Sequence, residues 1–289
     1  MAEVIAGGST YRRPLVWYFA ALTVVTLLAG LPWVLASRGV IDPAFESALS
    51  VAVFAPSLSG LVAALAAGGR PGLRALLRSL MRWRFGWRWW AICLVATPAF
   101  VGAGGVAAWA VGLAPDGAFD WRKLALLPAV MLGTILTGGG LTEELGWRGF
   151  LLPRLLERGW SARRATVVVG VAWWAWHAPA LGAGGPAWLA LAFVGIGLPL
   201  TVLLSFPLSL AWLATGRSTL APVLMHGAIN GSAITIAMGF GDLETPGMAA
   251  FLLGAVAFGT LPAGALALAM WGRAQQRKTP HQTGGASFD

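Results

Sequence analysis

The sequence predicts an all-α protein: a polytopic membrane bundle of about eight transmembrane helices, with a basic amphipathic helix on its cytoplasmic side. Three observations support this fold class. First, 57% of the 289 residues are hydrophobic and only 11% are charged, whereas soluble proteins carry about 25% charged residues. Second, the apolar residues are grouped into runs long enough to cross a bilayer. Third, the basic residues between these runs are distributed unequally between alternate loops.

The apolar runs define the predicted spans, because roughly 20 apolar residues cross the hydrocarbon core as a helix. In the sixth run, Pro199 and Pro207 can kink or split the helix. The first run is too long for a signal-peptide core and has no clear cleavage site, so we interpret it as a retained span. The predicted spans cover residues 15–37, 48–67, 88–112, 124–151, 163–179, 187–213, 218–240 and 248–271.

These spans form a single predicted transmembrane domain, residues 15–271. A cytoplasmic segment, residues 1–14, precedes it, and a polar tail, residues 272–289, follows and is expected to be disordered. The single cysteine, Cys93, lies in an apolar run, so an internal disulfide and a cysteine-based metal site are both excluded.

The basic residues predict the orientation of the chain. If the N-terminus is cytoplasmic, 16 of the 20 Lys and Arg lie in inner segments. Only Arg38, Arg122 and Lys123 lie in outer loops, and Arg148 lies within a span. This asymmetry predicts a multi-pass protein of the cell inner (plasma) membrane with both termini cytoplasmic. The net charge of +9 therefore reflects membrane topology, and we expect no nucleic-acid partner.

A basic segment follows the second span. Arg70, Arg74, Arg78 and Arg82 recur every four residues with leucines between them. This pattern is typical of a basic amphipathic helix on an anionic membrane surface. It serves either as a positive-inside anchor or as a docking surface for a substrate or partner.

Strongly polar side chains also lie inside the predicted spans, where an ionisable group costs about 2.5–3.5 kcal/mol. Such groups need partners or a hydrated cavity, so they are candidate functional residues. They are Glu143, Glu144, Arg148, His177, His226 and Asn230.

The fourth span holds two adjacent glutamates after the glycines at 138–140, which we interpret as letting another helix come close. Glu144 and Arg148 are four residues apart on a helix and can pair. Glu143 points about 100° away from Glu144. A structural Glu–Arg pair would account for one glutamate and leave Glu143 for another role.

Each of the two histidines inside the predicted spans, considered alone, could have either a functional or a structural role. His177 follows a tryptophan-rich segment, and a lone histidine among aromatics is often a core residue. His226 and Asn230 share one helix face, which indicates either a common cavity or interhelical hydrogen bonds. Taken together, carboxylate, imidazole and amide groups are the parts needed to activate water and stabilise an oxyanion. Two histidines and a glutamate also form a common zinc set, but the sequence contains no His-Glu-x-x-His motif.

Three ordered motifs give the chain a resemblance to a known family. They are Glu-Glu-x-x-x-Arg from Glu143, aromatic-x-x-x-His from Trp173, and His-x-x-x-Asn from His226. Together they resemble the CAAX protease and bacteriocin-processing (CPBP) family of intramembrane proteases, which includes Rce1-type prenyl-protein endopeptidases and bacterial Abi proteins. The resemblance covers about residues 140–231, and Trp173 stands where the family usually has phenylalanine.

The resemblance implies a catalytic core within residues 124–240 and a role for each polar side chain. Glu143, with His177 beside it, would activate water, and His226 and Asn230 would form the oxyanion hole. Supporting roles would fall to Glu144, Arg148 and Trp173.

The cofactor and the substrate remain open at this point. The family has been described both as metal-dependent and as metal-free glutamate proteases, and we expect no metal because asparagine is a poor zinc ligand. The alternative is zinc bound by Glu143, His177 and His226. The expected partners are membrane lipid and a membrane-associated peptide or protein. A transporter, or a non-catalytic immunity or scaffold protein, could use the same polar cluster.

Overall fold

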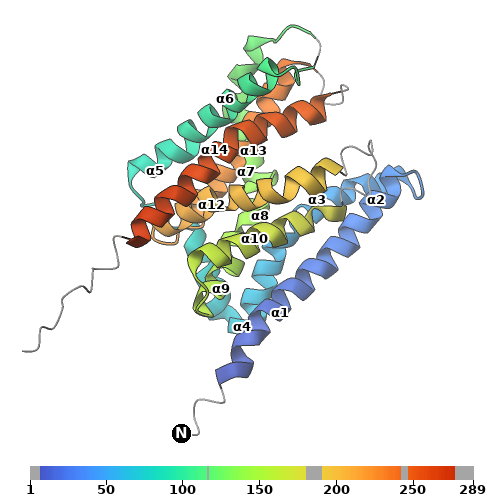
Figure 1. The fold of residues 1–289 in the computed structure, drawn as a ribbon. Coiled ribbons are helices and arrows are strands. Elements are labelled where there is room, and N and C mark those ends of the chain that lie inside the picture. Colours follow the sequence, from blue (N-terminus) through green and yellow to red (C-terminus); the bar gives the residue numbers. More distant parts are fainter. Residues whose placement is uncertain (1–6, 116, 180–190, 242–246, 277–289) are drawn as a thin grey trace, which may run out of the picture.

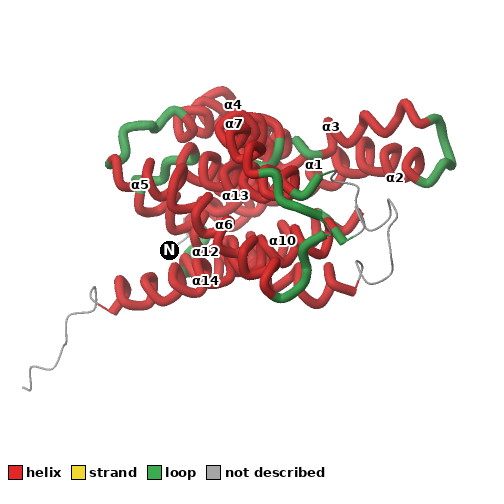
Figure 2. Tube along the Cα trace, turned by 90° about the horizontal axis from the view of Figure 1, so that it is seen from above, coloured by secondary structure: helices red, strands yellow, loops and turns green. Residues whose placement is uncertain are grey.

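The computed structural model describes residues 7–115, 117–179, 191–241 and 247–276. Within these residues every regular element is a helix, and loops join the helices without any strand (Figures 1 and 2). The predicted all-α membrane bundle is therefore confirmed. The α-helices are α1 (Gly7–Val25), α2 (Leu31–Ser37), α3 (Leu49–Ala52), α4 (Ala55–Leu80), α5 (Trp87–Ala91), α6 (Thr97–Ala110), α7 (Leu127–Thr137), α8 (Gly140–Gly146), α9 (Leu152–Glu157), α10 (Ala162–Trp176), α12 (Leu198–Ala214), α13 (Leu220–Gly239) and α14 (Met248–Gln276).

Short segments of other helical types link several of these helices into longer ones. Four are π-helical: η1 (Thr26–Gly30), η3 (Ile92–Ala96), η5 (Trp147–Leu151) and η7 (Phe193–Gly197). Two are 3-10 helices: η2 (Pro43–Ala48) and η4 (Trp121–Leu126). π-Helical turns are often found near functional sites, and η5 contains Arg148.

Six helices of the described residues are long and apolar enough to cross a membrane. A seventh span is obtained if the bent pair Pro43–Ala52 and Ala55–Leu80, which meet at 52°, counts as one. The six are Pro14–Ser37, Trp87–Ala110, Trp121–Glu157, Phe193–Ala214, Leu220–Gly239 and Met248–Ala269.

The difference from the predicted eight spans lies at the fifth span, residues 163–179. Its helix, α10, has 15 residues and ends at Trp176, because Pro179 cannot continue a helix. The predicted start of the next span, residues 187–190, lies outside the described residues. At the other end of the chain, α14 continues to Gln276, and the predicted tail beyond it, residues 277–289, also lies outside them.

The second span and the basic segment form one continuous element, α4. Gly69 has a positive φ of 56° and kinks α4 between its apolar and its basic halves. A Cβ on Gly72 would lie 2.6 Å from the carbonyl oxygen of Ala64, so the two halves approach closely at the kink. The predicted basic helix is therefore present, attached to the span through a glycine.

Helix α13 is the most buried of the candidate spans, with 78% of its apolar window inside the protein. Helix α13 packs against α7 through two glycines. A Cβ atom on Gly227 would lie 2.7 Å from the backbone nitrogen of Ile135. A Cβ atom on Gly231 would lie 2.7 Å from the Cα atom of Met131. The Thr134 hydroxyl also donates to the Gly227 carbonyl at 2.6 Å. Small residues thus hold α7 and α13 close together, as is common in membrane bundles.

The packing of α6 against α14 gives a stability prediction. A Cβ on Gly104 would collide with the backbone of Ala255 and lie within 2.8 Å of the Cα of Gly259. We expect Gly104→Ala to separate the helices and to lower the free energy of unfolding by about 1–3 kcal/mol. Thermal unfolding in detergent should show this as a lower Tm. Gly102→Ala on the same helix is the matched control, because nothing lies within 4 Å of its Cβ. Equal Tm values for the two variants would contradict the close contact.

Candidate active site

A break in the fourth span creates the site. The predicted continuous helix 124–151 is interrupted between α7 and α8, where Gly139 has a φ of 106° that side-chain-bearing residues rarely adopt. The Gly139 N–H donates to the Thr142 hydroxyl at 3.0 Å, which satisfies the first turn of α8. The Gly138 carbonyl accepts a hydrogen bond from Asn230 Nδ2 at 2.8 Å. These two backbone groups beside the break are therefore paired within the protein, as membrane burial requires.

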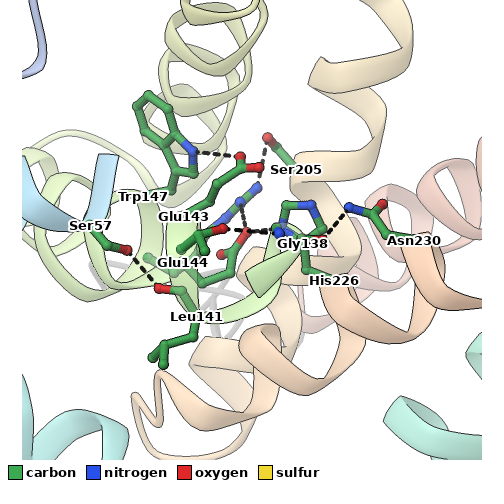
Figure 3. Close-up of polar contacts among 12 residues, drawn as sticks. Ser57, Gly138, Leu141, Glu143, Glu144, Trp147, Ser205, His226 and Asn230 are labelled. Carbon is green, nitrogen blue, oxygen red and sulfur yellow. Dashed lines mark hydrogen bonds and ion pairs between the residues drawn. The ribbon is translucent and has the colours of Figure 1, made fainter. Parts of the chain in front are cut away.

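Glu144 is fully buried and joins two helices through one oxygen. Its Oε1 accepts a hydrogen bond from Arg148 Nη1 at 2.7 Å and another from His226 Nδ1 at 2.7 Å (Figure 3). The ion pair with Arg148 follows from their spacing of four residues. The bond to His226 spans 82 residues of sequence. Glu144 therefore orients His226 as well as neutralising Arg148, which is more than the pairing expected from the sequence.

Arg148 is also fully buried, and three groups surround its guanidinium. In addition to the bond to Glu144, its Nη2 donates to the Ser205 hydroxyl of α12 at 2.9 Å. The guanidinium carbon lies 5.2 Å from the centre of the Trp173 ring, within the range of a cation–π interaction. The Trp173 ring also meets the His226 ring edge to face at 5.1 Å. Trp173 thus packs between the cation and the imidazole.

The two expected oxyanion donors converge beside the helix break. A Cβ on Gly139 would lie 2.7 Å from Nε2 of His226 and 2.5 Å from Nδ2 of Asn230. Both nitrogens therefore face the backbone of Gly139, and only glycine leaves room for them. Because the Glu144 carboxylate accepts from Nδ1, the Nδ1 atom of His226 carries a proton. Its Nε2 is a donor when the ring is an imidazolium.

Glu143 takes no part in the hydrogen bonds of the Glu144–Arg148 pair. It is 6% exposed, and its Oε2 accepts a hydrogen bond from the Trp147 indole at 3.3 Å (Figure 3). Within the described residues no cation forms a salt bridge with it. Glu143 lines a cavity of about 440 Å³.

His177 caps the C-terminus of α10. Its backbone N–H donates to the Trp174 carbonyl at 3.0 Å, and its Nδ1 lies 2.8 Å from the Trp173 carbonyl oxygen. A carbonyl only accepts, so Nδ1 carries the proton and Nε2 of the neutral ring has a free lone pair. The end of the short helix α10 therefore orients this imidazole as an acceptor at Nε2.

The four predicted catalytic residues lie around two adjoining cavities. Glu143, His177 and Asn230 line the cavity of about 440 Å³. His177, His226 and Asn230 line a smaller one of about 170 Å³, whose remaining wall is mainly apolar. His177 and Asn230 belong to both cavities. The short helix α10 thus brings His177 to the same cavity as Glu143, as a joint site requires.

A zinc centre is the alternative predicted for these side chains. Among the described residues, no three of His, Cys, Asp and Glu are grouped so that they could hold a metal ion. The described side chains of Glu143, His177 and His226 therefore do not form the grouping that the alternative zinc site would need. Metal-free water activation stays a prediction.

Three features of the site were not expected from the sequence. Trp147 lies four residues after Glu143, so helical spacing could have indicated its hydrogen bond. Ser205 lies on a distant helix, and no local pattern connects it with Arg148. The glycines at 138–140 were interpreted only as permitting close helix packing. Packing does explain Gly140, whose Cβ would lie 2.7 Å from the Val223 carbonyl oxygen, but Gly138 and Gly139 break the helix.

Fold and site together define a multi-pass helical membrane protein with a carboxylate, imidazole and amide cluster buried at a helix break. Residues 124–232 match the family model of Rce1-like proteins, described as type II CAAX prenyl endopeptidase Rce1-like. The match confirms the resemblance drawn from the three motifs, and it supports a CAAX-type intramembrane protease in general. The matched segment contains Glu143, Glu144, Arg148, His177, His226 and Asn230. A comparison with curated proteins finds no match.

The buried ion pair gives a second prediction. Arg148→Met removes the cation and leaves Glu144 buried without it, so we expect a loss of about 3–5 kcal/mol in the free energy of unfolding. Thermal unfolding in detergent should show a large fall in Tm. The double variant Glu144→Gln/Arg148→Met removes both charges and should recover part of the loss.

The control for this prediction is an ion pair at the surface. Arg154 pairs with Glu157 at 2.6 Å, and both side chains are partly exposed. Arg154→Met should therefore cost about 0–1 kcal/mol. The prediction fails if Arg148→Met lowers Tm no more than Arg154→Met does.

Proposed function

We propose that the protein is a glutamate-type intramembrane endopeptidase that hydrolyses a peptide bond of a membrane-associated peptide or protein. One observation carries this proposal. A carboxylate and an imidazole line one cavity, while the donor nitrogens of His226 and Asn230 converge beside the adjacent helix break. Acyl hydrolysis needs these two parts, one to activate water and one to stabilise the oxyanion.

In the proposed reaction, Glu143 acts as the general base. Its carboxylate removes a proton from water as the water oxygen attacks the carbonyl carbon of the scissile bond. The Trp147 indole, which donates to Oε2, holds the carboxylate in place and leaves Oε1 for the water. The free Nε2 of His177 accepts a hydrogen bond from the second water hydrogen.

The attack converts the carbonyl oxygen into an oxyanion. His226 and Asn230 donate to it through Nε2–H and Nδ2–H. The imidazolium form of His226 supplies the first of these protons and also balances the charge of the cluster, because two carboxylates then face two cations. Glu144 positions His226 through Nδ1. The protonated Glu143 finally gives its proton to the leaving amine as the C–N bond breaks.

The first activity prediction concerns the base. We expect Glu143→Gln to lower kcat about 10²–10⁴-fold, because an amide cannot accept the water proton. The measurement is cleavage of a panel of membrane-tethered peptides, prenylated and unmodified, by purified protein. Glu157→Gln changes an exposed carboxylate on α9 and serves as the matched control. Cleavage by Glu143→Gln at the wild-type rate would exclude this mechanism.

The same assay with added chelator tests whether hydrolysis requires a metal ion. Metal-free hydrolysis predicts equal rates with and without chelator. Loss of activity on chelation, followed by recovery with zinc, would replace the proposed mechanism with a metal-dependent one.

The second activity prediction concerns the oxyanion donors. We expect Asn230→Ala to lower kcat about 10²–10³-fold with a smaller change in KM, because the oxyanion exists only after attack. His226→Ala should behave in the same way. An increase in KM at constant kcat would instead assign these residues to substrate binding.

A further inference from the structure

The basic half of α4, the loop after it and the start of α5 carry six arginines that the proposed reaction does not use. We call this region the arginine surface. All six of its arginines are exposed. They are Arg70, Arg74, Arg78, Arg82, Arg84 and Arg88.

The charge of the arginine surface is not neutralised by the described part of the chain. The salt bridges of the described residues involve the carboxylates of Glu144, Asp120 and Glu157. None of them includes one of the six arginines. Glu157 is bound by Arg154. The surface therefore has the charge of a binding site for an anion that the described residues do not supply.

Large apolar side chains accompany the arginines. Trp83 is 56% exposed and Trp87 is 75% exposed, and Met81 beside them is 72% exposed. The Arg84 guanidinium lies 5.2 Å from the centre of the Trp83 ring. Tryptophan next to arginine is the composition found at the boundary between lipid headgroups and acyl chains. A purely aqueous acidic partner would leave these indoles without an apolar environment.

Hydrogen bonds hold this region against the loop before α13. Arg82 Nη1 donates to the Gly216 carbonyl at 2.8 Å, and the Ser218 hydroxyl donates to the Arg82 carbonyl at 2.7 Å. The Thr219 N–H donates to the Ser79 carbonyl at 3.0 Å, and the two hydroxyls of Ser79 and Thr219 lie 2.7 Å apart. The backbone that carries the arginine surface is thus held in place around Ser79 and Arg82, which lowers the entropy lost on binding.

The kink at Gly69 separates the arginine surface from the apolar half of α4. Helix α4 and the segment Pro43–Ala52 before it together form a candidate span. In Figure 1 helix α4 lies beside α9, toward the end of the bundle where α1 begins and α14 finishes. Helix α4 therefore delivers the arginines to the region where apolar spans end, which is the level of the lipid headgroups.

We propose that the arginine surface binds the headgroups of anionic phospholipids, with Trp83 and Trp87 in the interfacial region. Charge, exposed indoles and position at the end of the spans favour a lipid surface over an acidic protein. Each arginine near an anionic surface contributes about fivefold in affinity.

The test measures lipid binding to the purified full chain in neutral detergent by native mass spectrometry, with phosphatidylglycerol and phosphatidylcholine as probes. We expect the wild type to prefer phosphatidylglycerol and high salt to weaken this preference. Arg74→Gln/Arg78→Gln should lower the affinity for phosphatidylglycerol about 25-fold. Arg74→Lys/Arg78→Lys should retain most of it, because the charge is unchanged.

The matched control is Arg122→Gln/Lys123→Gln, which removes the same charge from the segment between α6 and α7. This variant should bind phosphatidylglycerol as the wild type does. Equal binding by Arg74→Gln/Arg78→Gln and the control would overturn the proposal. Binding of an oligoglutamate peptide in place of phosphatidylglycerol would overturn it as well, and would identify an acidic protein as the partner.

Discussion

The carboxylate of Glu144 accepts hydrogen bonds from Arg148 and His226 through a single oxygen, in a part of the protein that water does not reach. An ionised group in such a place is stable only with charged or polar partners, because desolvation costs several kcal/mol. The same bonds connect α8, η5 and α13. A fully buried charge therefore also determines how the helices that carry the site are held together.

The small residues of the bundle serve this interaction. Gly227 and Gly231 bring α13 against α7, and Gly140 brings α8 against α13. Gly139 adopts a positive φ that turns the chain between α7 and α8 and leaves space for two side-chain nitrogens. A side chain at any of these positions would push apart the helices whose polar groups must meet.

Most of the site could be predicted from local patterns, and the remainder could not because it depends on tertiary contacts. The pairing of Glu144 with Arg148 follows from their spacing on one helix, and the polar residues stand out because apolar sequence surrounds them. The bond from His226 to Glu144 joins residues 82 positions apart, so no helical period reveals it. The fold shows the same limit: apolar runs predicted the spans well, yet the end of α10 at Trp176 and the break at Gly139 depend on single residues within them.

The two adjacent glutamates therefore have different environments for a geometric reason. A helix turns about 100° per residue, so the two side chains leave α8 in different directions and form different hydrogen bonds. Glu144 faces the helices that supply Arg148 and His226, and its charge is compensated there. Glu143 faces the cavity, where a single indole holds one of its oxygens. Adjacent placement on α8 lets one carboxylate orient His226 on α13 while the other lines the cavity.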